Sequence, residues 1–416
     1  MRTHTEHAAS VRALLDPVLA GLARATPELL EIGEPELNGR VAAAPIVATD
    51  ALPPFDNSQM DGYAVRVVDL QSGTTTLRIG QTTAAGDAPI PHEPGTAAPV
   101  MTGAAIPIGA DAVIPIEQAM PTRFTELLRA GEAQPQGTVS FAEIPPTGAF
   151  VRPRGSDLPR GATILPAGTR LTPARVGLLA SAGVTEVPVR PRPRILLVST
   201  GDEVAIPGAA LGPGQIHDAN TPLLAALLRE AGAVVRTARS TDDAAALWLL
   251  LDTLAPHTDL IITSGGISAG AFEVVREALA SENVEFGGIA LQPGGPQGHG
   301  TIHTSVGPVP VLCFPGNPVS SALSAELFVM PPLRGYSGRP EYLRSERRPL
   351  GHDVTSPLHK HQVRRGRLDA AGNVLLTGPS SHLLADLAAA EVLAHIPVGI
   401  EHLPAGTPID LWRLDD

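Results

Sequence analysis

Three short loops rich in glycine, serine and asparagine follow predicted strands in the middle of the chain. Glycine lets a backbone approach a phosphate closely, and a helix that begins after such a loop offers free N–H groups and a favourable dipole. Taken singly, each loop is more often an ordinary turn, and none matches the patterns GxxxxGK(S/T) or GxGxxG. Together at one edge of a sheet they favour a phosphate-bearing ligand. The loops are Ser199-Thr200-Gly201-Asp202-Glu203, Ser264-Gly265-Gly266-Ile267-Ser268-Ala269-Gly270 and Pro315-Gly316-Asn317-Pro318-Val319-Ser320-Ser321.

Carboxylates lie in or beside these loops. Asp202 and Glu203 directly follow one predicted strand, Asp242 and Asp243 follow another, and Asp61 lies in a turn nearer the N-terminus. Carboxylate oxygens together with substrate phosphates are the ligands that Mg²⁺ prefers. Asp242 and Asp243 could instead cap the helix that follows them, and this alternative is stronger for Asp243. Asp202 could equally form a turn, so Glu203 is the firmest candidate.

The elements that must position these loops alternate between strands and helices. Because the apolar strand runs are continuous, the strands should be buried on both faces, as in a mostly parallel sheet with helices on both sides. The predicted strands span 194–199, 233–238, 259–263, 284–291 and 309–314, and the predicted helices span 221–231, 242–254, 272–280 and 317–329.

The flanking regions have a different pattern. Apolar residues at helical spacing predict a helix over 8–25 that Pro17 bends or splits, and a shorter helix is predicted over 172–183. Short strands and turns dominate 60–150 and 335–416. The sequence therefore predicts a multidomain protein, with a central three-layer α/β domain, a β-rich insertion domain and a C-terminal β domain.

Composition narrows the function. The net charge of −12 argues against a broad nucleic-acid interface, and no apolar run is long enough to span a membrane. The single cysteine, Cys313, suits a reducing compartment and most simply acts as a buried small hydrophobe. The polar N-terminus carries no signal core, so we expect a cytoplasmic protein. Lys360 is the only lysine; the other 29 of the 30 basic residues are arginines.

A set of motifs in one order along nearly the whole chain resembles the molybdopterin molybdenumtransferases, the family that includes the gephyrin E domain. The long first motif and the PGNPVS motif are the most specific. The matching segments are PPFDNSQMDGYAV at 53–65, MTGA at 101–104, GADAV at 109–113 with Glu117, RPRGSD at 152–157, TGDE at 200–203, SGG at 264–266, PGNPVS at 315–320 and SSHL at 380–383.

The resemblance implies an architecture and a reaction. It implies a linking domain made of 1–56 and 148–190, an insertion domain over 57–147, a molybdopterin-binding domain over 191–334 and a C-terminal domain over 335–416. The implied assembly is a homodimer whose cleft lies between the α/β domain of one subunit and the insertion of the other. The implied reaction joins molybdate to adenylylated molybdopterin with Mg²⁺ and releases AMP. Further candidate partners are the molybdopterin adenylyltransferase and apo-molybdoenzymes, with no nucleic acid and no membrane.

Residue roles follow from the same resemblance. Asp61, Glu203 and Asp242 are the implied metal or phosphate-end carboxylates, and Thr102, Glu117 and Asp157 would position the ligand. Glu273 stands where the family usually has aspartate. The molybdate end would be touched by Ser320, Arg365 and Ser381. The remaining implied substrate-binding residues are Ser199, Gly201, Asp202, Ser264, Gly265, Gly266, Ser268, Pro293, Gly294, Pro315, Gly316, Asn317, Pro318 and Arg276.

One segment departs from the family. Where the family carries Lys-Pro-Gly-Lys-Pro, this chain reads QPGGP at 292–296, so both lysines are lost. A charge-assisted hydrogen bond contributes roughly 1.5–3 kcal/mol, so losing two should weaken anion binding by one to a few orders of magnitude. Arg276, or His299 or His303 downstream, could compensate. Lys360 could be a further anion contact or a solvated surface lysine.

Two alternatives to an active transferase remain open from the sequence. A catalytically impaired paralogue could bind molybdopterin or its adenylate as a carrier, regulator or scaffold. The α/β domain could also serve a different nucleotide substrate, because related domains occur in other nucleotide-handling proteins. The retained carboxylates Asp61, Asp157 and Glu203 argue against a purely structural role.

Overall fold

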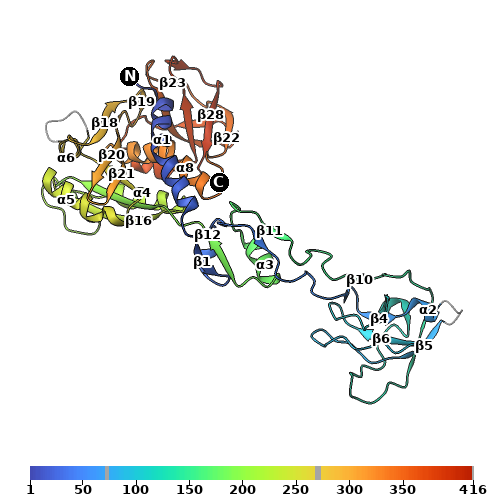
Figure 1. Cartoon of the computed structure of the whole chain (residues 1–416). Helices are drawn as coiled ribbons and strands as arrows, with labels where there is room; N and C mark the ends of the chain where they lie inside the picture. The colour runs from blue at the N-terminus through green and yellow to red at the C-terminus, as the bar shows by residue number, and fades with distance from the viewer. Residues whose placement is uncertain (71–74, 268–272, 415–416) are drawn as a thin grey trace.

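The computed structural model describes residues 1–70, 75–267 and 273–414, and it shows an elongated molecule (Figure 1). The α/β region and the C-terminal β region lie together at one end, and the β-rich insertion lies at the other. Three antiparallel strand pairs connect them, because the chain runs out through one strand of each pair and returns through the other. They are β1 (Glu28–Glu31) with β12 (Glu186–Val189), β2 (Ile46–Val47) with β11 (Thr163–Leu165), and β3 (Asn57–Ser58) with β10 (Val151–Arg152).

The α/β region is built on a mixed sheet with the strand order β16-β13-β17-β21-β20-β18. The first four strands in that order are parallel, as their apolar runs predict. The last two pair antiparallel with their neighbours. The bounds are β13 (Arg194–Thr200), β16 (Val234–Ser240), β17 (Leu260–Ser264), β18 (Asn283–Gly288), β20 (Pro296–Thr304) and β21 (Gly307–Phe314).

The antiparallel strand β20 corrects the sequence prediction, which has one strand over 284–291 and none at His299 and His303. Both histidines lie in β20. Glycines hid the strand pattern, because β18 packs too closely for side chains. A Cβ on Gly300 would lie 2.0 Å from the Asn283 carbonyl oxygen, and one on Gly298 would lie 2.7 Å from the Phe286 ring.

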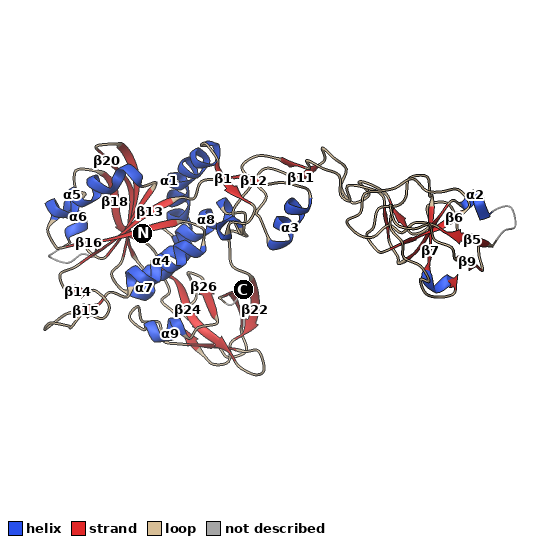
Figure 2. Ribbon diagram, turned by 90° about the horizontal axis from the view of Figure 1, so that it is seen from below, coloured by secondary structure: helices blue, strands red, loops and turns tan. Residues whose placement is uncertain are grey.

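Alternate side chains of β13 enter two different hydrophobic clusters. Ile195 and Leu197 pack with α1, α4 and α7, whereas Leu196 and Val198 pack with α5 and α6. Figure 2 shows these helices against the sheet. Cys313 in β21 is fully buried in the second cluster, and burial raises the pKa of its thiol to about 12. The bounds are α4 (Asn220–Glu230), α5 (Ala244–Leu254), α6 (Val274–Ala278), α7 (Pro318–Ser324) and α8 (Met330–Tyr336), with a π-helical turn at Ala325–Val329 between the last two.

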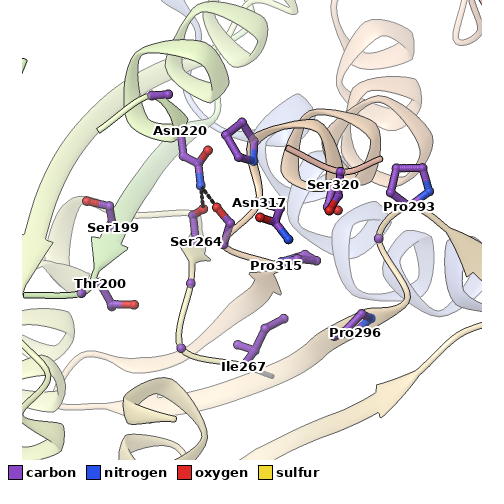
Figure 3. Close-up of a pocket in the computed structure, with 18 of the residues that line it drawn as sticks. Ser199, Thr200, Asn220, Ser264, Ile267, Pro293, Pro296, Pro315, Asn317 and Ser320 are labelled. Carbon is purple, nitrogen blue, oxygen red and sulfur yellow. Dashed lines mark hydrogen bonds between the residues drawn. The ribbon is translucent and has the colours of Figure 1, made fainter. Parts of the chain in front are cut away.

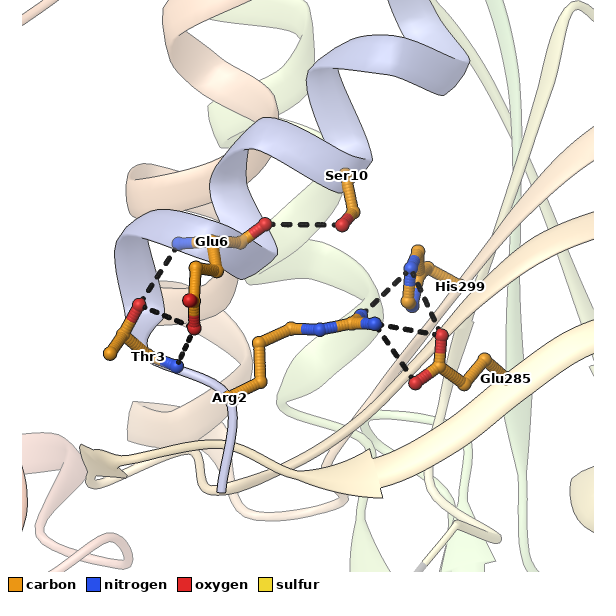
Figure 4. A network of polar contacts seen from close by, with 6 residues as sticks. All are labelled: Arg2, Thr3, Glu6, Ser10, Glu285 and His299. Atoms are coloured by element: carbon orange, nitrogen blue, oxygen red, sulfur yellow. Dashed lines mark hydrogen bonds and ion pairs between the residues drawn. The ribbon is translucent and has the colours of Figure 1, made fainter.

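The first helix, α1 (His4–Arg24), begins earlier than predicted, and Pro17 does not split it. Thr3 accepts a hydrogen bond from the Glu6 backbone while the Glu6 carboxylate accepts from the Thr3 backbone, which forms a capping box (Figure 4). Arg2 ties this end to the sheet: its guanidinium lies 2.9 Å from the Glu285 carboxylate and 3.1 Å from His299 Nε2. Burial of Val11, Leu15 and Leu19 holds the helix across the proline.

The two β-rich regions have their own sheets. The insertion sheet has the order β7-β4-β6-β5-β9-β8, and the C-terminal sheet has the order β19-β24-β26-β28-β22 with β25 beside β24. The insertion elements are β4 (Gly62–Val65), α2 (Val67–Leu70), β5 (Thr76–Ile79), β6 (Thr96–Val100), β7 (Ala112–Pro115), β8 (Ala119–Met120) and β9 (Thr138–Phe141). The C-terminal elements are β19 (Leu291–Gln292), β22 (Ser345–Pro349), β24 (His361–Leu368), β25 (Val374–Leu376), α9 (Leu384–Ala388), β26 (Val392–Ile396) and β28 (Pro408–Arg413).

Shorter elements complete the described chain. The predicted helix at 172–183 is present as α3, and Gly183 follows it with φ +78°. The described residues contain no helix with both the length and the apolar character needed to cross a membrane. The remaining elements are α3 (Pro173–Ser181), β14 (Val204–Ala205), β15 (Ile216–His217), β23 (Val354–Thr355) and β27 (His402–Leu403), with 3₁₀ turns at Pro35–Leu37, Ile116–Gln118 and Ala255–His257.

Histidines gather where α1 meets the C-terminal sheet. The ring of His4 stacks on that of His361 at 4.0 Å, and His361 Nε2 lies 3.1 Å from His395 Nδ1. Burial, reinforced by neighbouring cationic groups, lowers the pKa of His7 and of His361 to about 3 and that of His395 to about 4. These three histidines are therefore neutral in the folded protein at neutral pH.

Acid should therefore destabilise this junction. Because the folded-state pKa values lie below the unfolded value of 6.5, the unfolded chain binds more protons, and stability is lost as the pH falls from 6.5 toward 4. We expect the free energy of unfolding to fall by about 2–5 kcal/mol between pH 6.5 and pH 5. Urea denaturation at both pH values measures it. His361→Gln should reduce the pH dependence, and His257→Gln, at an exposed site, should not. If the free energy of unfolding depended equally on pH in the wild type, His361→Gln and His257→Gln, this explanation would be wrong.

Candidate functional site

A cavity of about 810 Å³ lies at the carboxyl ends of β13, β17 and β21 (Figure 3). All three glycine-rich loops line it, as the sequence predicts for the edge of a parallel sheet. Its other wall comes from the segment around β19 and from the C-terminal region. The predicted residues that line it are Ser199, Gly201, Glu203, Asp242, Ser264, Gly265, Gly266, Glu273, Pro293, Gly294, Pro315, Gly316, Asn317, Pro318, Ser320 and Ser381.

Glycine is required where two of the loops approach each other. Gly265 has φ +98°, and a Cβ on it would lie 3.1 Å from the Thr200 carbonyl oxygen. Gly266 has φ +64°, and a Cβ on it would lie 3.2 Å from Thr200 Oγ1. The loops therefore present bare backbone to the cavity, which is what a closely held phosphate needs.

Asn220, at the start of α4, joins these loops. Its Nδ2 donates to Ser264 Oγ at 2.8 Å and to the Gly316 carbonyl oxygen at 2.7 Å (Figure 3). The Asn220 Oδ1 and Thr200 Oγ1 atoms are buried and have no hydrogen-bond partner among the described residues. Because an unpaired buried polar atom costs roughly 1–3 kcal/mol, these two atoms are suited to a polar ligand.

Replacing Asn220 should therefore loosen the loops. Asn220→Ala removes both bonds, and we expect roughly tenfold weaker binding of molybdopterin, the ligand that the family resemblance implies. Fluorescence titration with molybdopterin measures the affinity. Asn38→Ala, at an exposed position outside the cavity lining, is the matched control. Equal affinity in the two variants would show that Asn220 does not organise the site.

The acidic residues in the cavity have distinct roles. Asp218 is buried and accepts hydrogen bonds from Ser199 Oγ at 3.0 Å and from Thr221. Its carboxylate therefore fixes the backbone at the end of β13. The exposed Glu203 carboxylate folds over Gly201, where a Cβ would lie 2.5 Å from Glu203 Oε2. Glu273 also lines the cavity.

The two neighbouring aspartates differ as the sequence predicted. Asp243 is the N-cap of α5 and accepts from the Ala246 backbone at 2.8 Å. Asp242 lines the cavity, and its carboxylate accepts from the Asp202 backbone at 3.2 Å. In turn, the Asp202 carboxylate accepts a hydrogen bond from the Asp242 backbone N–H at 3.4 Å. Asp202 itself is not among the residues that line the cavity. The Asp202 side chain therefore positions Asp242.

The carboxylates of this cavity suit Mg²⁺ that is shared with a phosphate ligand. Within the described residues, no three histidine, cysteine or acidic side chains are grouped closely enough to hold a metal by themselves. Glu203 and Asp242 both reach the same cavity as the phosphate-binding loops. Mg²⁺ usually keeps a few protein carboxylates and takes its other ligands from water and substrate phosphates, which fits this donor set.

The C-terminal region supplies the opposite wall through Pro379, Ser380 and Ser381. Arg365 holds this loop from behind: it is fully buried and donates to the carbonyl oxygens of Gly378 at 2.7 Å and Ser380 at 3.0 Å. Burial lowers the pKa of Arg365, and Asp386 offsets part of this. Arg365 is not among the lining residues, so its contribution here is to position the loop.

The insertion residues form a separate cluster. Asp61 accepts from the Thr102 backbone at 2.6 Å and from Thr102 Oγ1 at 2.8 Å. Glu117 and Asp157 also belong to this outer part of the molecule. None of the four lines the cavity, and the insertion lies at the far end of the chain (Figure 1). One chain therefore does not bring Asp61 to Glu203 and Asp242.

The proposed substitutes for the missing lysines lie elsewhere. The Arg276 guanidinium lies 5.3 Å from the Phe286 ring centroid, His299 contacts Arg2, and His303 contacts Glu282. None of the three lines the cavity. The physical reason is that each side chain is held by a contact outside the cavity: Arg276 by Phe286, His299 by Arg2 and His303 by Glu282. Ser268 lies outside the described residues.

Several lining residues escaped the sequence analysis. The sequence patterns indicate Thr200 and Ser380 only as members of longer motifs. They give no role to Asn220 or Asp218. Asp218 and Asn220 follow a strand-like Ile-His pair and begin a helix, a signal that resembles the other loops. The sequence allows Lys360 to be either an anion contact or a solvated surface residue. In the structure, Lys360 lines the cavity.

Fold and cavity together define a multidomain α/β protein whose ligand site lies at the carboxyl ends of parallel strands. Three family models cover most of the chain: the MoeA N-terminal region (domain I and II) matches 3–183, a probable molybdopterin binding domain matches 196–335, and the MoeA C-terminal region (domain IV) matches 347–414.

Individual related proteins have names that match these family models. Molybdopterin molybdenumtransferase 2 of Mycobacterium tuberculosis is 42% identical over 395 residues, covering 91% of this chain and 93% of that protein. The molybdopterin molybdenumtransferase of Haemophilus influenzae is 33% identical over 310 residues, covering 74% and 72%. A molybdopterin biosynthesis MoeA structure from Pyrococcus horikoshii superimposes with a TM-score of 0.77 at 27% identity, covering 97% of this chain and 99% of that chain. The chain belongs to the molybdopterin molybdenumtransferase family.

Proposed function

We propose that this protein is a transferase of molybdenum cofactor biosynthesis. It binds adenylylated molybdopterin in the cavity, joins molybdate to the pterin dithiolene and releases AMP. The names of its relatives support the reaction class. The observation that carries the proposal is the meeting of three glycine-rich loops with Glu203 and Asp242 in one cavity. Backbone N–H groups for a pyrophosphate and carboxylates for its counterion are what cleavage of a phosphoanhydride needs.

The chain's own residues divide this work between two ends of the cavity. The loops at 199–203, 264–266 and 315–317 bind and orient the phosphates, while Glu203 and Asp242 would hold Mg²⁺ there. A bound Mg²⁺ supplies electrostatic stabilisation of the charge that develops as the phosphoanhydride is cleaved. Ser320 and Ser381, on the other side, offer hydroxyl groups to the oxygens of molybdate.

The assembly that completes the site is a homodimer in this proposal. The four units 1–56 with 148–190, 57–147, 191–334 and 335–416 would act as linking, insertion, ligand-binding and closing domains. The insertion of one subunit would then place Asp61, Thr102 and Glu117 against the cavity of the other, together with Asp157 of the adjoining linking segment. The elongated chain, with its insertion far from its own cavity, supports this arrangement (Figure 1).

Purified protein tests the proposed reaction. Incubation with adenylylated molybdopterin and Mg²⁺ should release AMP at a rate that rises with added molybdate. AMP release that is absent, or that is unchanged by molybdate, would contradict the proposal.

A further inference from the structure

The cavity carries an unbalanced charge. Glu203, Asp218, Asp242 and Glu273 are acidic residues in its lining, whereas Lys360 is the only lysine or arginine among the described lining residues. The undescribed segment 268–272 reads Ser-Ala-Gly-Ala-Phe and adds no cation. Mg²⁺ can offset carboxylates at the phosphate end, but an oxyanion at the other end needs a positive group of its own.

Lys360 lies beside the segment that has lost both family lysines. Strands β19 and β24 pair in parallel with Leu291 opposite His361 and Gln292 opposite Gln362, and the His361 backbone donates to the Ala290 carbonyl oxygen at 2.9 Å. Lys360 directly precedes β24, so its backbone adjoins the start of the QPGGP segment. Both Lys360 and that segment line the cavity.

The lost lysine positions are electrically neutral. Gln292 is held by its neighbour, because Gln362 Nε2 donates to Gln292 Oε1 at 2.6 Å. Gly295 lacks a side chain. The half-buried Lys360 ammonium, by contrast, has no hydrogen bond or ion pair to any described residue. An ammonium at the cavity wall without a protein partner is available to a ligand.

We propose that Lys360 binds the molybdate oxyanion at this wall of the cavity. The inference deepens the proposed function and rests on it. The ammonium would reach the cavity from the C-terminal wall, on the same side as Ser380 and Ser381. The neutral QPGGP segment and Lys360 form one wall through the β19–β24 pair, and Lys360 is a substrate-binding residue of that wall.

Removing and relocating the charge tests this assignment. Lys360→Met should raise the molybdate concentration for half-maximal AMP release on the order of 10- to 100-fold, because a charge-assisted contact is lost. Lys360→Arg should stay near the wild type. Arg24→Met, which removes an exposed charge at the end of α1, is the matched control. Molybdopterin affinity should be the same in all four proteins.

A second variant supplies a gain of function. Gly295 has an ordinary φ, and a Cβ there would meet only the Leu291 and Ile289 carbonyl oxygens at 3.5 and 3.6 Å, so a side chain fits. Gly295→Lys in the Lys360→Met background should recover most of the lost molybdate affinity. Recovery would show that charge at this wall, and not the fold around Lys360, sets the affinity.

A failure of the Lys360 assignment and a failure of the proposed function give different experimental results. A wild type that turns over with molybdate and a Lys360→Met variant with the same half-maximal concentration would overturn the assignment and leave the function intact. A wild type without molybdate-dependent turnover would overturn the proposed function. In that case, equilibrium dialysis of molybdate alone against wild type and Lys360→Met still decides: equal binding overturns the assignment, and weaker binding by the variant supports it.

Discussion

Replacing Glu203 by glutamine or Asp242 by asparagine is expected to lower molybdate-dependent AMP release by about 10²–10³-fold. Both carboxylates line the cavity beside the phosphate-binding loops. Asp242 also accepts a hydrogen bond from the Asp202 backbone at 3.2 Å, and an asparagine oxygen can still accept that bond. Each amide keeps the shape of the side chain but removes the charge that would hold Mg²⁺. Initial rates at saturating substrate, followed across a range of Mg²⁺ concentrations, measure the effect.

The chain offers a matched control one residue away. Asp243→Asn changes the neighbouring carboxylate in the same way, but Asp243 caps α5 and asparagine caps a helix equally well. The rate of AMP release by Asp243→Asn, and the dependence of that rate on Mg²⁺, should equal those of the wild type. A rate loss in Asp243→Asn as large as in Asp242→Asn would show that the acidic turn as a whole, and not the cavity carboxylate, matters.

Mixed dimers are expected to recover activity from two inactive variants. Asp61 belongs to the insertion and Glu203 to the cavity, and one chain keeps them apart (Figure 1). If each site is shared between subunits, a dimer of Asp61→Ala with Glu203→Gln has one site with both residues intact. Random co-assembly should then give about a quarter of the wild-type rate, because half the dimers carry one good site of two.

Co-expression with two different affinity tags isolates the mixed dimers, and each variant alone is the control. Each homodimer should have little activity, and the purified mixed dimer should reach about half the wild-type rate. A mixed dimer no faster than its two parents would show that Asp61 and Glu203 do not meet across subunits.

The parallel strands and their loops were predictable because they depend on local patterns. The runs at 194–199, 259–263 and 309–314 have continuous apolar centres, and the structure places β13, β17 and β21 there. Strand β20 could not be predicted by pattern. Its Gly298 and Gly300 are set by close packing against β18, a long-range contact that hydrophobic periodicity does not record.

In the candidate site, too, some features depend on local sequence patterns and others on long-range contacts. The loops and the Asp242–Asp243 distinction follow from sequence position relative to a strand and a helix. The place of Lys360 does not, because it depends on β19 leaving the α/β region to pair with β24 of the C-terminal sheet. Arg276 is closer in sequence to the QPGGP segment, but it lies on α6 with its guanidinium over the Phe286 ring of β18.

The central claim is that this cavity couples molybdate insertion to release of AMP. A single-turnover experiment tests it most directly: enzyme in excess over adenylylated molybdopterin, with Mg²⁺, is mixed with molybdate, and AMP and molybdenum cofactor are both quantified over time. We expect the two products to appear together in equal amounts, and AMP to form slowly when molybdate is omitted. AMP formed at the same rate without molybdate, or formed with no cofactor, would contradict it.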